Sequence, residues 1–232
     1  MSEKKIETVA ILVDGAFYLK RAHNLFGEKS PSDRAKELMT YCNRHLKGNH
    51  LYRIFYYDCP PMETQLYHPL LQKQVPMKGT ERYEWSTQFF DHLANMRKVA
   101  IRLGELQEKE SGYRLREKAM RKLVSGELSA CDLTVKDFVI NIEQKGVDMR
   151  IGLDIASLAH KKQVSQIVLI SGDSDFVPAA KHARREGIDF ILDPMWHGIK
   201  PELNKHIDGL HSCTSKNPTP ENEKLCVKKP RQ

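Results

Sequence analysis

Cysteine is scarce in this sequence, and the spacing of its few cysteines argues against two structural roles. The 232 residues include five cysteines, at positions 42, 59, 131, 213 and 226, and no two of them form a Cys-x-x-Cys pair. An odd number of widely separated cysteines is typical neither of a disulfide framework nor of a structural zinc site. We therefore expect free thiols in a reducing compartment.

Long apolar runs and several catalytic motifs are absent as well. No stretch approaches the roughly 18 apolar residues of a membrane-spanning helix, and the opening MSEKKIETVA lacks the apolar core of a secretory signal. These absences predict a cytoplasmic protein without a membrane partner. The sequence also lacks the G-x-x-x-x-G-K-[ST] motif of P-loop NTPases, and VDGAFY lacks the second aspartate of a D-x-D phosphatase motif.

What remains is the composition of an ordinary globular domain. Hydrophobic residues make up 40% of the chain and charged residues 29%. The formal net charge of +7 permits a polyanionic partner but does not require one. Residues 213–232 are rich in proline and lysine, which predicts a basic disordered tail. We expect residues 1–212 to form a single domain.

Apolar strands alternate with helical patterns along that domain, which predicts an α/β fold. Strands are expected at 7–15, 50–59, 98–106, 166–175 and 187–193, and helices at 32–49, 82–96, 147–162 and 176–187, with Ser32 as the N-cap of the first. A helix or loop fits 16–27. Such alternation predicts an open, mostly parallel sheet with helices on both faces. The charge-dense run 107–130 is expected to be a hairpin or helical insertion, and 137–146 a short strand.

Aspartates follow two of the predicted strands. Asp14 ends the first strand, and Asp173 and Asp175 come directly after the apolar run QIVLI. Ligands of open α/β sheets bind beyond the carboxyl ends of the strands, so these acids meet at one edge if the two strands are neighbours. Asp148, at the start of a predicted helix, is aligned with its buried stripe. Clustered carboxylates repel one another, and Mg²⁺ or Mn²⁺ would neutralise them.

Each aspartate also has a simpler interpretation. Asp14, Asp148 and Asp173 could be helix N-caps, with Asp175 solvated. Asp154 lies on another face of the same predicted helix, and a surface ion pair with Arg150, four residues earlier, explains it at least as well as a place in the acidic group. The sequence leaves these alternatives open.

Three segments together resemble a known family. VAILVDGAFY, QKGVDMRIGLDIASLA and IVLISGDSDFVPAAKHARREG are similar to NYN-domain proteins, in particular to the LabA-like branch of the PIN-like nuclease superfamily. The resemblance extends from about residue 8 to about residue 195. It implies a PIN-like, Rossmann-like three-layer fold and metal-dependent cleavage of RNA. Its metal-binding and catalytic acids would be Asp14, Asp148, Asp173 and Asp175, with Asp154 as a second-tier metal ligand.

The function predicted from these observations is that of a metal-dependent ribonuclease. It would hydrolyse RNA, most simply single-stranded RNA, with a water activated at an acidic Mg²⁺ or Mn²⁺ site. The alternative is a regulatory module that binds RNA or protein and retains the acidic pocket without turnover. Candidate RNA contacts are Lys145, Lys181, Arg184, Arg185 and Trp196. Basic residues in the last turn of a helix also complement its dipole, and a tryptophan can simply fill the edge of a core.

Overall fold

The computed structural model describes residues 6–216 and 227–228. The chain divides into two compact units. We call the first the sheet unit, comprising residues 1–58, 88–104 and 146–232, and the second the hairpin unit, comprising residues 59–87 and 105–145. In the part of the chain that the structure describes, no helix is long and apolar enough to cross a bilayer.

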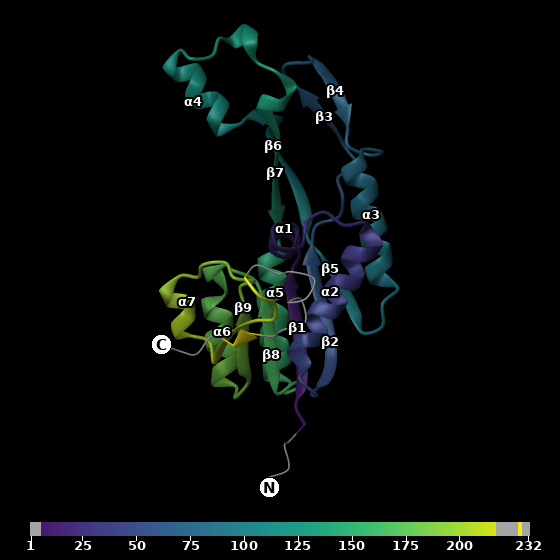
Figure 1. Ribbon diagram of the computed structural model, residues 1–232, viewed down its shortest axis with the longest axis vertical. Helices are drawn as coiled ribbons and strands as arrows, with labels where there is room; N and C mark the ends of the chain where they lie inside the picture. The colour runs from purple at the N-terminus through teal and green to yellow at the C-terminus, as the bar shows by residue number, and fades with distance from the viewer. Residues whose placement is uncertain (1–5, 217–226, 229–232) are drawn as a thin grey trace. The chain divides into compact units, whose positions relative to one another are not determined.

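The sheet unit is built on one sheet with the strand order β11-β10-β9-β8-β1-β2-β5 (Figure 1). All neighbouring pairs are parallel except β10 and β11, which are antiparallel. The strands are β1 (Thr8–Asp14), β2 (His50–Asp58), β5 (Val99–Leu103), β8 (Gln166–Ile170), β9 (Asp189–Asp193), β10 (Gly209–Ser212) and β11 (Val227–Lys228). The predicted α/β fold with a mostly parallel sheet is confirmed.

The central strands are apolar because both of their faces are covered. Residues 9–13 of β1 are fully buried, and so are Ile167, Leu169 and Ile170 of β8. Adjacent side chains of β2 show the two faces, since successive strand residues point in opposite directions. The Tyr56 ring packs edge-on against Phe89 of α3, with 5.6 Å between ring centroids, whereas the Tyr57 hydroxyl donates to Asp154 of α5. Helices therefore cover both faces.

The helices of the sheet unit follow the predicted order. They are α1 (Gly15–Phe26), α2 (Pro31–Leu46), the last half of α3 (Glu81–Ala94), α5 (Val147–His160), α6 (Val177–Arg185) and α7 (Pro201–Lys205). The last of them, α7, was not predicted from the sequence. The predicted N-cap of α2 is wrong by two residues. Ser30 caps the helix by accepting from the Asp33 backbone N–H, because Pro31 lacks an N–H and so fits the first helical position.

The hairpin unit consists of two antiparallel strand pairs. The first pair is β3 (Gln65–His68) with β4 (Lys73–Pro76), and the second is β6 (Glu105–Leu115) with β7 (Phe138–Lys145). Between β6 and β7 lie α4 (Glu117–Ser125) and the 3-10 turns η1 (Ala130–Asp132) and η2 (Val135–Asp137). The buried His68 ring joins the pairs, with its centroid 4.5 Å from Tyr113 and 5.0 Å from Phe138. The charged run 107–130 thus contains both a strand and a helix.

The basic tail is predicted for residues 213–232. Cys213 and Thr214 are completely buried, so the folded part of the sheet unit continues past residue 212. Residues 217–226 and 229–232 of the predicted tail lie outside the described residues.

Candidate functional site

Two neighbouring central strands carry the predicted acids to one edge of the sheet. β1 and β8 pair in parallel, with Val13 opposite Ile170. Their carboxyl ends therefore lie side by side, and Asp14 and the segment 171–175 follow at the same level. This is the edge at which open α/β sheets bind their ligands.

Asp14 is held rigidly between α1 and β8. Its Oδ1 accepts from the Phe17 backbone N–H at 3.1 Å, which makes Asp14 the N-cap of α1, and its Oδ2 accepts from the Ser171 hydroxyl at 3.1 Å. Burial raises the pKa of Asp14 to about 6, against the effect of these hydrogen bonds, and the charges of Asp148 and Asp58 raise it further. The N-cap interpretation is correct for Asp14, but the pKa of its carboxyl is raised all the same.

Asp173 and Asp175 belong to a tight turn after β8. Asp173 caps the 3-10 turn η3 (Ser174–Phe176) by accepting from the Asp175 backbone N–H at 3.0 Å. The Ser171 hydroxyl accepts from the Asp173 backbone N–H at 3.3 Å, so one serine links Asp14 to this turn. A Cβ at Gly172 would lie 2.8 Å from the Phe17 ring, so the turn has room only for glycine there.

Asp148 differs from both of its predicted placements. The N-cap of α5 is Gly146, in the left-handed conformation with φ of 76°, so the N-cap interpretation of Asp148 is wrong. Its side chain is also exposed and not part of the buried stripe, which runs through Val147, Ile151 and Ile155 and so starts one residue before Asp148. Partial desolvation, and then the charges of Asp173 and Asp175, raise the pKa of Asp148 above its ordinary value.

The four acids therefore form one electrostatic group. Asp148 interacts with Asp14 on one side and with Asp173 and Asp175 on the other, and every one of these interactions disfavours ionisation. Among the described residues, the acids do not bring three carboxylate oxygens within 4.8 Å of one another. Carboxylate oxygens suit Mg²⁺ or Mn²⁺, and Mg²⁺ typically binds one or two carboxylates and keeps several waters. The donor set fits such an ion.

Asp154 has a different environment from the other acids. Its Oδ2 accepts from the Tyr57 hydroxyl at 2.7 Å and forms an ion pair with Arg102 at 3.3 Å. The predicted surface pair with Arg150 is therefore wrong, because the next strand of the sheet supplies the cation. Asp154 also lines a cavity of about 230 Å³ together with Arg102 and Phe55. These contacts account for Asp154 without a metal.

Sequence reasoning missed two residues at this edge. Ser171 is completely buried and hydrogen-bonded to two parts of the acidic group. Asp58 ends β2, accepts from the Tyr56 hydroxyl at 3.2 Å and contributes to the raised pKa of Asp14. Its position at the end of a buried strand is the same signal that selected Asp14, and would have found it.

The basic candidates fall into two groups. Lys181 and Arg185 are exposed on α6, whereas Arg184 on the same helix forms an ion pair with Asp208 at 2.8 Å. Lys145 ends β7 of the hairpin unit and forms an ion pair with Glu143 at 3.0 Å. Arg184 therefore has a structural partner, and the exposed cations of α6 are better placed to meet a ligand.

Trp196 is anchored within the sheet unit. Its indole N–H donates to the Thr214 carbonyl at 2.7 Å, and its backbone N–H donates to the Ser212 hydroxyl at 3.2 Å. The side chain is half-buried. These contacts favour the interpretation of Trp196 as a residue that fills the edge of the core.

Comparison with known protein families identifies the family of this chain. The NYN domain model matches residues 86–209, which include Asp148, Asp173 and Asp175 but not Asp14. No curated protein matches the chain. A protein of unknown function from Vibrio parahaemolyticus shares 14% identity over 90% of this chain and 94% of its own, with a TM-score of 0.46. A Sir2 mutant with a p53 peptide and NAD shares 11% identity over 90% and 87%, with a TM-score of 0.32.

Both TM-scores lie below 0.5, so neither structure informs the function of this chain. The family match is the informative comparison, because it covers more than half of the chain and the turn that carries two of the acids. NYN domains fall within the PIN-like nuclease superfamily, whose members typically use divalent metals. The chain belongs to the NYN domain family.

Proposed function

We propose that this protein is a metal-dependent ribonuclease of the LabA-like branch of NYN proteins, hydrolysing RNA phosphodiesters. The observation that carries the proposal is the gathering of Asp14, Asp148, Asp173 and Asp175 at the ligand-binding edge of a parallel sheet. Burial, and then the neighbouring carboxylates, raise the pKa of Asp14 and of Asp148. Carboxyl groups perturbed in this way are typical of sites that bind a cation or carry out a reaction.

The four acids would hold Mg²⁺ or Mn²⁺, and a bound ion would supply a Lewis acid that polarises the phosphodiester. Asp14 has a fixed position in that site. Its hydrogen bonds from the Phe17 backbone N–H and the Ser171 hydroxyl would hold the carboxyl in one orientation.

The proposed substrate is single-stranded RNA. Exposed Lys181 and Arg185 on α6, the helix that follows the acidic turn, would contact phosphates, with Lys145 as a further candidate. Arg184 and Trp196 are weaker candidates because both are engaged with other residues. We further propose a cytoplasmic location, because Cys42, Cys59, Cys131 and Cys213 are all free thiols, as is usual in a reducing compartment.

A cleavage assay tests the proposal directly. Purified full-length protein is incubated with end-labelled single-stranded RNA in Mn²⁺, in Mg²⁺ or in chelator. Cleavage is expected only with metal, and Asp148→Asn and Asp173→Asn are each expected to lower the rate by about 100-fold or more, the scale of removing one preorganised charge from an active site.

The matched control is Asp91→Asn, an exposed aspartate of α3 in the sheet unit, which should cleave like the wild type. Asp154→Asn separates its two interpretations. We expect it to lower stability while retaining most of the activity, because its partners are Tyr57 and Arg102. Metal-dependent cleavage that persists undiminished in Asp173→Asn would mean that the activity belongs to a contaminant or to another site.

One observation favours the alternative, a regulatory module without turnover. Asp14 and Asp173 are both N-caps, a role that needs no metal. Calorimetric titration with Mn²⁺ decides between the two functions. The nuclease requires binding that is lost in Asp148→Asn, whereas a module would bind RNA in a salt-dependent way and remain indifferent to that substitution.

A further inference from the structure

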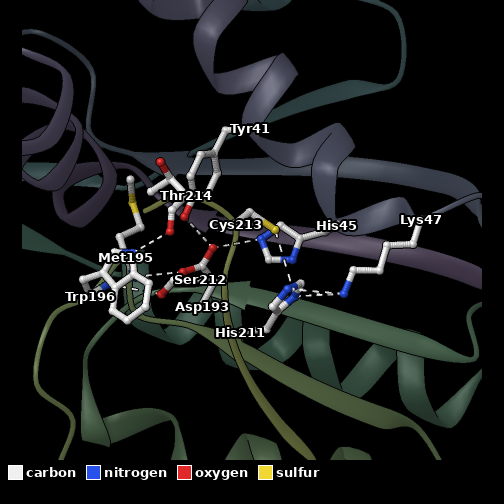
Figure 2. Close-up of polar contacts among 10 residues, drawn as sticks. All are labelled: Tyr41, His45, Lys47, Asp193, Met195, Trp196, His211, Ser212, Cys213 and Thr214. Atoms are coloured by element: carbon white, nitrogen blue, oxygen red, sulfur yellow. Dashed lines mark hydrogen bonds and ion pairs between the residues drawn. The ribbon is translucent and has the colours of Figure 1, made fainter. Parts of the chain in front are cut away.

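A second group of metal-ligand side chains lies within the sheet unit, apart from the acids. His45 near the end of α2, His211 of β10 and Cys213 just after β10 each offer one ligand atom, and these atoms all lie within 4.8 Å of one another. Their side chains gather in one place in Figure 2. The three residues are buried, with exposed fractions of 4%, 7% and 0%. Among the described residues, this is the group of three histidine, cysteine or acidic side chains whose ligand atoms all lie within 4.8 Å of one another.

The His45 ring is held in one tautomer by a buried carboxylate. Its Nε2 lies 2.9 Å from Asp193 Oδ2, and because a carboxylate only accepts, Nε2 donates. Asp193 is itself fixed, since Oδ2 accepts from the Tyr41 hydroxyl at 2.6 Å and Oδ1 from the Met195 backbone N–H at 2.7 Å. Nδ1 of His45 therefore carries the lone pair. A carboxylate behind a ligating histidine is the usual support of a metal-bound imidazole.

Cys213 Sγ and His211 Nδ1 are separated by little more than the usual distance between two ligand atoms of one zinc ion. Cys213 Sγ lies 4.0 Å from His211 Nδ1, and the His45 and His211 rings are perpendicular, with centroids 5.4 Å apart. Tetrahedral zinc with ordinary Zn–N and Zn–S bonds places ligand atoms about 3.3–3.6 Å apart. The Cys213–His211 pair would contract by about 0.5 Å to hold such an ion, and the pairs with His45, whose ligand atom lies within 4.8 Å of the other two, by no more than about 1.5 Å.

An exposed lysine contacts the group from outside. The Lys47 ammonium lies 3.3 Å from both nitrogens of the His211 ring. A positive charge beside His211 opposes the binding of a cation, but a long flexible side chain can withdraw into solvent when an ion enters.

We propose that His45, His211 and Cys213 bind one Zn²⁺ ion, with water as the fourth ligand. Two imidazoles and a thiolate are the donors that zinc prefers, whereas Mg²⁺ and Mn²⁺ prefer oxygen. The ion ties the end of α2 to β10 and to the segment that begins at Cys213. This site is independent of the proposed nuclease function, and none of its ligands lies within the residues matched by the NYN domain model.

Cobalt substitution tests the site by a spectroscopic readout. Full-length protein, freed of metal by chelator, is titrated with Co²⁺ at micromolar concentration. We expect one ion per chain, a thiolate-to-cobalt charge-transfer band and the visible absorption of tetrahedral Co²⁺, all abolished by added Zn²⁺. Cys213→Ser should lose the charge-transfer band, and Cys131→Ser, which changes an exposed thiol, should keep it.

Thermal unfolding gives a second readout. Free Zn²⁺ at about 100 times its dissociation constant should raise the Tm of the wild type by roughly 5–10 °C and leave that of His211→Gln unchanged. Lys47→Asn should bind Zn²⁺ more tightly, because no ammonium must be displaced and asparagine tolerates the left-handed backbone at this position, φ 48°.

Three results would overturn the proposal. They are a folded wild-type protein that shows no thiolate-to-cobalt band, a band that survives in Cys213→Ser, and binding that appears only at millimolar metal. Circular dichroism establishes that each variant is folded. If Cys213→Ser does not fold, His211→Gln carries the same comparison, and the wild-type spectrum is decisive without either variant.

Discussion

Replacing Asp14 by asparagine should stabilise the protein while it destroys the site. The carboxyl is half-buried, and its pKa lies at about 6, against 3.8 for an ordinary aspartate, chiefly because burial disfavours the ionised form. One pKa unit corresponds to about 1.4 kcal/mol, so the ionised carboxyl destabilises the folded state by at most about 3 kcal/mol. Asparagine keeps the cap, since its oxygen still accepts from the Phe17 backbone N–H.

The sign of the pH dependence follows from proton binding. Between about pH 4 and pH 6 the folded state holds the Asp14 proton more tightly than the unfolded state does, so the contribution of Asp14 to stability is complete below about pH 4 and is lost as the pH rises through about 6. Asp14→Asn has no such proton. The variant should therefore equal the wild type near pH 4 and exceed it by up to about 3 kcal/mol near pH 8.

Urea unfolding at a series of pH values, in the presence of chelator, measures this difference. Ser171→Ala tests the cause, because the Ser171 hydroxyl donates to Asp14 and lowers its pKa. Without that hydroxyl, the pH range over which stability falls should move upward. A free-energy difference between Asp14→Asn and the wild type that stays constant from pH 4 to pH 8 would refute the claim that burial penalises this charge.

Three further perturbations have defined outcomes. A Cβ at residue 15 would lie 2.6 Å from the Tyr56 ring and the Tyr57 carbonyl oxygen, so Gly15→Ala should destabilise the fold by about 1–3 kcal/mol in urea unfolding; an unchanged midpoint would contradict this. Tyr57→Phe removes the hydrogen bond to Asp154 and should lower stability by about 1–2 kcal/mol with little change in RNA cleavage, whereas a large fall in cleavage would return Asp154 to the site. RNA affinity, measured by fluorescence anisotropy, should fall steeply as salt rises if phosphates are contacted, and insensitivity to salt would argue against the proposed basic contacts.

Much of the fold could be predicted from local sequence, because it depends on short apolar runs and on the glycine, proline and capping residues that end them. QIVLI is apolar throughout since β8 is buried on both faces, and Asp14 ends β1 because the chain leaves the core there. Helix boundaries were less certain. Ser30 and Ser32 are both plausible caps, and the proline between them decides in favour of the first.

The environment of each side chain could not be predicted from such runs. Asp154 is attached to Tyr57 and Arg102, which come from separate strands, so no local pattern pointed to them. Asp148 is exposed because the buried stripe of α5 begins at its neighbour Val147, and helical periodicity alone does not reveal which of the two residues faces the core.

The sequence by itself determined the order of strands and helices, the acids at the strand ends and the resemblance to NYN proteins, because these follow from local apolar patterns and short motifs. Only the tertiary structure decided which side chains meet. The raised pKa of Asp14 requires burial and the neighbouring charges of Asp148 and Asp58. His45, His211 and Cys213 meet because β10 pairs with β9 and α2 packs against the end of β9, and the second of these contacts joins residues 148 positions apart in the sequence.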